Sequence, residues 1–430
     1  MVQEQAETGV MFEVLNNRGK LLSELEKLKN YILYISSKLG DQSLRETTNA
    51  VWSKIFKTLM RRGLDSQEDE NRFLLAHWQA YAGTKSYNTR LYDDFKDRYP
   101  VNYKAEFSKY SAILHQYLKD LEESLLIFVD FYSPDHQDAF SKFLPQERIE
   151  LRRWVKRINK IKKLTSIVSL LIAVNIKGKG YDDLISTMVE SERLGFLVYH
   201  IAEKRGDTAK SVFIKSAYQL YNDQIQLEEV LKNLHDVAAT HCSSSHFFSF
   251  LKSLEVDFYK WDGIPYFLAQ YEYSKRLDEI KNAKLKTENN NNNNNDSAME
   301  LKSEIEDPMT IDIKFCDPEV EECIKGAEIE HILPQDYDAK GWKKKFDCPE
   351  DYVNCLGNLT LTHQNSELKN KSFLKKCKLY SKSTIAIEKE IVEFKSWDAT
   401  SVNTRTESMC EWAAKRWDVK QTKKRRKSMN

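Results

Sequence analysis

Glycine and proline are scarce in this chain, with 13 and 8 among 430 residues. Both residues interrupt regular helices, so their scarcity leaves long stretches free for helical periodicity. Cysteine is scarce as well, because the chain has only seven, at scattered positions. An odd number without the short paired spacings of zinc sites suits a reducing intracellular compartment better than a disulfide scaffold or a structural zinc site.

Long apolar runs are also missing. The most apolar stretch, Leu164 to Ile176, is about 13 residues long and is interrupted by polar residues such as Ser169 and Asn175. Such a stretch is too short to cross a bilayer, and the polar start of the chain does not resemble a targeting signal. We therefore expect a soluble, intracellular protein without a membrane partner.

A large excess of charge is absent too, because the formal net charge is +1. This excludes a broadly basic nucleic-acid coat, but the charge is unevenly distributed. Residues 328–430 contain 21 lysines and arginines against 15 acidic residues, a net charge of +6, which leaves −5 for the rest. The C-terminal part therefore suits a polyanionic partner.

A basic run near the C-terminus strengthens this expectation. The sequence predicts DNA-backbone contacts for four of its residues, Lys423, Lys424, Arg425 and Arg426. In a cell with a nucleus the same run would suit nuclear import. The alternative is a solvated tail.

An unbroken asparagine tract at 289–295 marks the main boundary, because it cannot bury enough apolar surface to fold. We place a linker at 286–303, a helical region at 1–285, a smaller domain at 304–418 and a basic tail at 419–430. In the helical region Leu25, Leu28 and Ile32 follow at intervals of three and four, and Ser23 with Glu26 predicts a capping box. Similar apolar stripes occupy 107–131, 149–174, 184–202 and 227–237.

The smaller domain has a different pattern. Ile329–Leu333, stopped by Pro334, and Leu356–Leu361 are strand candidates. Residues 365–379 then predict a helix with Leu368, Phe373, Leu374 and Leu379 on its apolar side. The predicted fold is therefore mainly α, a helical bundle or array followed by a smaller α+β domain in ββα order.

The polar residues of this domain suit phosphodiester hydrolysis. His331 can act as the base for the attacking water, and Glu330 with the Asn365 amide oxygen can bind a hard divalent ion. Asn358 can hold the loop between the strands or orient His331. Neighbouring strand residues face opposite ways, so Glu330 and His331 share one phosphate only if the backbone is irregular near Pro334, and Glu328 is the second choice as ligand.

These residues carry a resemblance to a known family. Glu-Ile-Glu-His-Ile-Leu-Pro-Gln at 328–335, Leu-Gly-Asn-Leu-Thr-Leu-Thr at 356–362 and Asn-Ser-Glu-Leu-Lys-Asn-Lys-Ser-Phe at 365–373 resemble the C-terminal nuclease domain of GmrSD-type modification-dependent restriction endonucleases. They are also similar to the HNH, or His-Me finger, core of RNA-guided Cas nucleases.

The resemblance implies a ββα-metal core with particular roles for these residues. Glu330 and Asn365 would bind Mg²⁺ or Mn²⁺, His331 would be the general base, and Asn358 would be the structural middle residue. The last part of the match, which covers roughly 325–418, resembles the family's closing helix through Trp397, Arg405 and Trp417.

A second resemblance lies near the N-terminus. Residues 11–19, Met-Phe-Glu-Val-Leu-Asn-Asn-Arg-Gly, are similar to the C-terminal part of the companion domain in those systems. That domain begins with a ParB-like fold and an Asp-Gly-Gln-Gln-Arg motif for nucleotide hydrolysis, a motif that this chain does not contain. The chain therefore carries no nucleotide motif of its own, and three interpretations stay open: a truncated gene product, a relic, or one piece of a split system in which a separate ParB-like NTPase chain or domain is the partner.

The favoured hypothesis from sequence is a metal-dependent HNH-type endonuclease that hydrolyses DNA. Four lysines of the predicted helix would hold the substrate backbone, namely Lys371, Lys375, Lys376 and Lys378. His363 is interpreted as a surface residue near the helix start, with contact to the phosphate or metal as the alternative. The competing hypothesis is a non-catalytic helical protein that binds a partner or nucleic acid and carries a decayed or partner-dependent nuclease core.

Overall fold

The computed structural model describes residues 22–83, 90–101, 109–161, 163–291, 322–338 and 341–420, without the side chains of 280 and 282–291. The predicted family segment at 11–19, the linker beyond residue 291 and the basic run with Lys423, Lys424, Arg425 and Arg426 therefore lie outside the described residues. The chain divides into two compact units. One contains the described residues up to Gly195 and Arg205–Val237, and the other contains Phe196–Lys204 and the described residues from Ala238 on.

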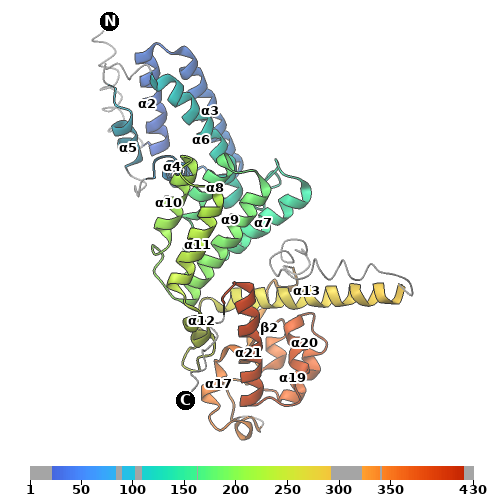
Figure 1. Ribbon diagram of the computed structural model, residues 1–430. Coiled ribbons are helices and arrows are strands. Elements are labelled where there is room, and N and C mark those ends of the chain that lie inside the picture. Colours follow the sequence, from blue (N-terminus) through green and yellow to red (C-terminus); the bar gives the residue numbers. More distant parts are fainter. Residues whose placement is uncertain are drawn as a thin grey trace, which may run out of the picture. The chain divides into compact units, whose positions relative to one another are not determined.

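The first unit is helical throughout its described residues (Figure 1). Its best-packed element is α8, which lies against α4, α6 and α10. All residues of α8 from Ile167 to Val174 are buried, so this helix is apolar on every side. The helices of this part are α2 (Glu24–Leu39), α3 (Gln42–Arg61), α4 (Gln67–Ala82), α5 (Leu91–Arg98), α6 (Tyr110–Tyr132), α7 (Pro145–Lys160), α8 (Ile167–Lys177), α9 (Tyr181–Gly195), α10 (Lys210–Tyr221) and α11 (Leu227–His241).

The first helix starts as the sequence predicts. The Ser23 hydroxyl accepts a hydrogen bond from the Glu26 backbone N–H at 3.1 Å, and the Glu26 carboxylate accepts one from the Ser23 N–H at 2.9 Å. Leu25, Leu28 and Ile32 are buried along the predicted stripe. The capping box and the helical character of this region are therefore confirmed.

The apolar stripe at 149–174 does not form one helix. α7 ends at Lys160, and α8 begins at Ile167. Lys163, between them, has a φ of 78°, in the left-handed region that a right-handed helix excludes. Apolar spacing alone does not reveal such a break, because residues on both sides of it face the same core.

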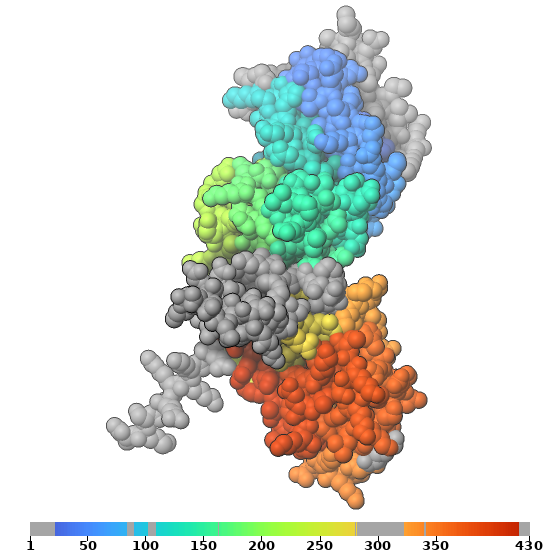
Figure 2. Space-filling view, turned by 90° about the vertical axis from the view of Figure 1, so that its right-hand side faces the viewer, coloured from blue at the N-terminus to red at the C-terminus, as the bar shows by residue number. Residues whose placement is uncertain are grey.

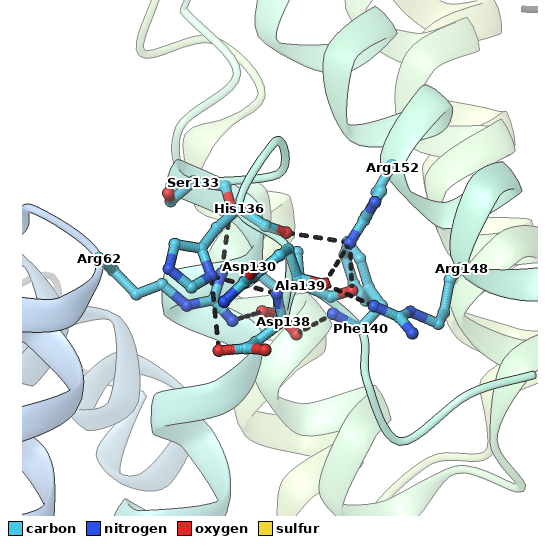
Figure 3. Close-up of polar contacts among 10 residues, drawn as sticks. Arg62, Asp130, Ser133, His136, Asp138, Ala139, Phe140, Arg148 and Arg152 are labelled. Atoms are coloured by element: carbon cyan, nitrogen blue, oxygen red, sulfur yellow. Dashed lines mark hydrogen bonds and ion pairs between the residues drawn. The ribbon is translucent and has the colours of Figure 1, made fainter. Parts of the chain in front are cut away.

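A network of charged side chains fixes the loop after α6 (Figure 3). Arg62 donates to the Asp130 carboxylate at 2.7 Å and to the Ser133 carbonyl at 3.2 Å. Asp130 also accepts from the Phe140 backbone N–H at 2.9 Å. Arg152 donates to the carbonyl groups of the same loop, at His136, Gln137 and Ala139. The charges of Arg62 and Asp130 are thus used to hold the loop.

The described part of the first unit contains one completely buried histidine, His77, whose burial favours the neutral imidazole and makes the free energy of unfolding depend on pH. His77 in α4 is completely buried, and its Nδ1 lies 2.9 Å from the Ser124 hydroxyl. Burial lowers the pKa of His77 from 6.5 to about 3. The unfolded chain therefore binds a proton below pH 6.5 that the folded chain does not, and acid favours unfolding.

We expect the free energy of unfolding of the first unit to fall by about 1.4 kcal/mol per pH unit below pH 6.5, and by about 2 kcal/mol at pH 5, because of this one group. His77→Gln should remove that slope, whatever its effect at pH 7. The measurement is urea unfolding of the whole chain at pH 7 and pH 5, followed by hydrogen exchange of peptides from α4. His136→Gln, at a partly exposed position, serves as the control and should keep the slope. An unchanged slope in His77→Gln would contradict the prediction.

The second unit combines helices with a small sheet. β1 (Glu328–His331) and β2 (Leu359–Thr362) form an antiparallel pair, which is the only sheet among the described residues. Figure 2 shows its orange and red residues as one closely packed body. Its helical elements are η2 (Phe196–Ile201), α12 (Ser244–Leu251), α13 (Ile264–Asn291), η4 (Lys343–Lys345), α17 (Glu350–Val353), η5 (Leu356–Asn358), α18 (Asn365–Leu368), α19 (Phe373–Tyr380), α20 (Ala386–Val392) and α21 (Ala399–Arg416).

The predicted helix at 365–379 is divided into α18 and α19. Lys369, between them, has a φ of 38°, so the helix cannot continue through it. The break also changes the buried face: Phe373 is buried as predicted, but Leu374 is 70% exposed. Leu374 was therefore wrongly assigned to the apolar side, because the phase of α18 does not continue into α19.

Helix α13 extends into the first residues of the asparagine tract, and it packs with elements that follow the tract. Glu272 of α13 is completely buried, and its carboxylate accepts hydrogen bonds at 2.8 Å from the backbone N–H groups of Ala386 and Ile387. These groups open α20 and have no partner within the helix, so Glu272 caps it. The predicted domain limits remain a prediction, but α13 and α20 belong to one compact unit. Among the described residues, no helix is long and apolar enough to span a bilayer.

Candidate active site

The two strands place the motif residues in register. Glu328 lies opposite Thr362, Glu330 opposite Thr360, and His331 opposite Leu359. Because side chains alternate along a strand, Glu328 and Glu330 point to one face of the sheet and His331 points to the other. The pairing is regular up to His331, so the structure does not bring Glu330 and His331 to the same face.

Glu330 faces the interior. It is 6% exposed, and Lys376 of α19 donates to its carboxylate at 2.5 Å and to the His331 carbonyl at 2.6 Å. Burial raises the pKa of Glu330 and lowers the pKa of Lys376, and each partner's charge opposes the shift of the other. One oxygen of Glu330 is thus occupied by an internal cation.

This contact changes the role of one predicted DNA-binding lysine. Lys376 is completely buried and does not reach the surface, because it lies on the buried face of α19 with Phe373 and Tyr380. Lys375 and Lys378 are exposed, and Lys371 is half-buried. Lys376 lies at intervals of three and four from Phe373 and Tyr380, which is the spacing of a buried helix face. Because the neighbouring lysines are exposed, the sequence alone did not distinguish Lys376 from them.

His331 is held at one edge and one face of its ring. Its Nε2 lies 3.0 Å from the Asn354 Oδ1, and its ring centroid lies 4.5 Å from that of Tyr259. Burial lowers the pKa of His331, while the hydrogen bond with Asn354 acts in the opposite direction. A lowered pKa favours the neutral imidazole at pH 7, which is the form that can accept a proton.

Asn358 is fully used in holding the loop between the strands. Its Oδ1 accepts from the Leu333 backbone N–H at 2.7 Å and from the Trp397 indole N–H at 3.0 Å. Its Nδ2 donates to the carbonyls of Leu333 and Val353 at 3.0 and 2.8 Å. The side chain is completely buried, so Asn358 does not itself contact a substrate in this structure. Of the two roles left open by the sequence, these bonds are those of the loop-holding residue.

The residue before Asn358 must be small. A Cβ at Gly357 would lie 2.3 Å from the Thr406 hydroxyl oxygen and 2.4 Å from the Val402 carbonyl oxygen of α21. The neighbouring Arg405 is buried and donates to the carbonyls of Gly357 and Leu359 at 2.9 and 2.8 Å. The closing helix thus supports the turn that enters β2.

Asn365 begins α18, just after β2. Its Nδ2 donates to the Glu328 carboxylate at 2.7 Å, so the structure pairs Asn365 with the second-choice ligand. The donor chemistry suits Mg²⁺ or Mn²⁺, since Glu328, Glu330 and Asn365 offer only oxygen ligands. Within the described residues, no group of three or more His, Cys, Asp and Glu side chains could hold a metal ion.

His363 lies at the surface. It is exposed, and its Nε2 lies 2.6 Å from the Cys323 carbonyl oxygen. This carbonyl belongs to the segment before β1. No hydrogen bond joins His363 to Glu328, Glu330 or Asn365 among the described residues.

The sequence did not point to Tyr259 or Asn354. Tyr259 lies outside the motif region, before α13, and Asn354 follows the short helix α17. The position of Asn354, four residues before Asn358, is only a weak indication that it belongs to the site. No sequence periodicity links Asn354 or Tyr259 to His331. Their proximity depends entirely on the tertiary fold.

Comparison with known proteins agrees with the resemblance noted in the sequence. Residues 250–412 match the family model described as GmrSD restriction endonucleases, C-terminal domain. The match includes α13 and Tyr259, and so begins well before the motif region. No curated protein matched the chain. The family match therefore supports a restriction endonuclease-like domain of the GmrSD C-terminal type at residues 250–412.

Proposed function

We propose that the second unit is a metal-dependent HNH-type endonuclease that hydrolyses DNA phosphodiester bonds, with β1, β2 and the following helices as a ββα-metal core. The observation that carries the proposal is the family match over residues 250–412, which contain the hairpin of β1 and β2. A neutral imidazole, His331, is fixed at the end of β1, while Glu328 and Asn365 pair at the other end of the same hairpin.

In this mechanism His331 accepts a proton from the attacking water as the new P–O bond forms and the P–O bond to the leaving oxygen breaks. The leaving oxygen then takes a proton from solvent water. Asn358 keeps the loop after His331 in place. The exposed Lys375 and Lys378 attract the phosphate backbone of the DNA. Glu328 and Asn365, which are already paired, would hold Mg²⁺ or Mn²⁺, and Glu330 would join them with the carboxylate oxygen that does not bond Lys376. The ion would supply the positive charge that stabilises the leaving oxygen.

Plasmid cleavage with Mg²⁺, Mn²⁺ or EDTA tests this proposal. We expect nicking or linearisation with a divalent ion and none with EDTA, and a loss of cleavage in Asn365→Ala. Calorimetric titration with Mn²⁺ should show weaker binding by the same variant. Asn403→Ala, at an exposed position of α21, is the matched control and should behave as wild type.

Two results of the cleavage experiment would contradict the proposal. Cleavage that persists in EDTA would exclude the metal dependence, and failure to cleave any DNA, including DNA with modified bases, would exclude the endonuclease. If cleavage appears only after addition of a co-purifying ParB-like NTPase, the nuclease is one part of a two-chain system.

One observation favours a second candidate, a nucleic-acid-binding protein with an inactive nuclease core. Glu330 is paired with Lys376, and His331 is only 7% exposed. This candidate predicts DNA binding that is unchanged by His331→Ala and no calorimetric signal for Mn²⁺.

A further inference from the structure

The surroundings of His331 determine more than its charge. A neutral imidazole carries its proton on one of two nitrogens, and only the other nitrogen can act as a base. A partner fixed at one nitrogen therefore decides which atom is available for chemistry. In this protein the partner at Nε2 is the side chain of Asn354, at 3.0 Å.

Asn354 presents its amide oxygen to the ring. An amide oxygen only accepts, so this contact is a hydrogen bond only in the tautomer in which the Nε2 of His331 carries the proton and donates it. In that tautomer Nδ1 is the unprotonated nitrogen. Among the described residues, none forms a hydrogen bond with Nδ1.

Asn354 itself is fixed on two sides. Its carbonyl accepts a hydrogen bond at 3.1 Å from the backbone N–H of Phe258, and the carbonyl of the preceding Val353 accepts one at 2.8 Å from Asn358. Asn358 also bonds the backbone of Leu333, two residues after His331. The buried Asn358 therefore joins the segment that follows His331 to the segment that contains Asn354.

The face of the ring is fixed as well. Tyr259 follows Phe258 directly, and its ring lies against the imidazole with centroids 4.5 Å apart. The segment before α13 thus provides both a backbone bond to Asn354 and an aromatic contact to His331. Tyr259 is 41% exposed, so the same ring also faces the surface.

We propose that Asn354 is the positioning residue of the general base, and that it holds His331 in the Nε2–H tautomer so that Nδ1 takes the proton of the attacking water. The proton transfer in this inference rests on the proposed function. The tautomer of His331 does not, because it depends only on the contact with Asn354. Asn354 does not contact the reacting atoms, and it acts through the ring that it orients.

The tautomer can be measured directly by ¹⁵N spectroscopy of the full chain with labelled histidine, without metal and without DNA. His331→Ala identifies the signals of this residue by their loss. We expect a protonated Nε2 and an unprotonated Nδ1 in wild type, and the same pattern in Asn354→Asp, which keeps an accepting oxygen. Asn354→Ala should show a mixture of both tautomers. An Nδ1–H tautomer in wild type would overturn the proposal even if Asn354→Ala does not fold.

Kinetics give the second readout. Asn354→Ala should lower kcat about 10- to 100-fold, as is found for partners that orient an imidazole, and should leave KM unchanged. Asn354→Asp should recover most of the loss, and Asn403→Ala should have no effect. An unchanged kcat in Asn354→Ala overturns the proposal. If the wild-type chain does not cleave DNA, the proposed function fails, while the spectra still decide the tautomer.

Discussion

Replacing His331 by alanine should reduce DNA cleavage about 10²- to 10⁴-fold, the usual contribution of a general base. The imidazole of His331 is the proposed proton acceptor at the end of β1, so its loss leaves the attacking water without a base. His331 makes one side-chain hydrogen bond, to Asn354, so the fold around it should persist. The measurement is the initial rate of plasmid cleavage at saturating Mg²⁺ or Mn²⁺.

A matched control separates catalysis from a general effect of losing a histidine. His363 lies in the same hairpin region but is exposed, and His363→Ala should keep the wild-type rate. His331→Gln, which keeps a polar side chain of similar size, should be as inactive as His331→Ala. Equal rates for wild type and His331→Ala would exclude His331 as the base.

Replacing Lys376 by methionine should lower the free energy of unfolding of the second unit by about 3–5 kcal/mol, because it leaves a buried carboxylate without its partner. Lys376 is completely buried, and it bonds both the Glu330 carboxylate and the His331 carbonyl. Methionine fills much of the same volume, so the loss is electrostatic rather than a cavity effect. The measurement is urea unfolding of the whole chain, followed by hydrogen exchange of peptides from α19.

Two further variants make this prediction specific. Lys375→Met, at an exposed position of the same helix, should change stability by less than about 0.5 kcal/mol. The double variant Lys376→Met with Glu330→Gln should recover most of the loss, since no buried charge is left unpaired. If Lys376→Met alone is as stable as wild type, Glu330 and Lys376 do not form the buried pair described here.

The two predictions concern opposite sides of one strand. His331 faces Asn354 and Tyr259, whereas Glu330 faces Lys376. Lys376 is nevertheless joined to both residues, because it bonds the side chain of Glu330 and the backbone carbonyl of His331. A change in this lysine can therefore alter the position of the base as well as stability, and the unfolding measurement should accompany any rate measured for it.

Much of the local structure follows from sequence. The capping box at Ser23 and Glu26, the two strand candidates and the helical character of the N-terminal region depend on neighbouring residues, and periodicity is a local property. Boundaries were less certain: the strand predicted at 356–361 is η5 followed by β2, because Asn358 holds a turn there. The loop-holding role of Asn358 was one of two that the sequence left open.

The sequence by itself determined the order of the motif, its chemical groups and the strand–strand–helix pattern in which they lie, because each depends on residues close together in the chain. Only the tertiary structure decided the partners. It buried Lys376 against Glu330, paired Asn365 with Glu328, and placed Tyr259 and Asn354 beside His331. Periodicity predicts which face of an element is buried, but the residue that meets this face is determined by packing between segments far apart in the sequence.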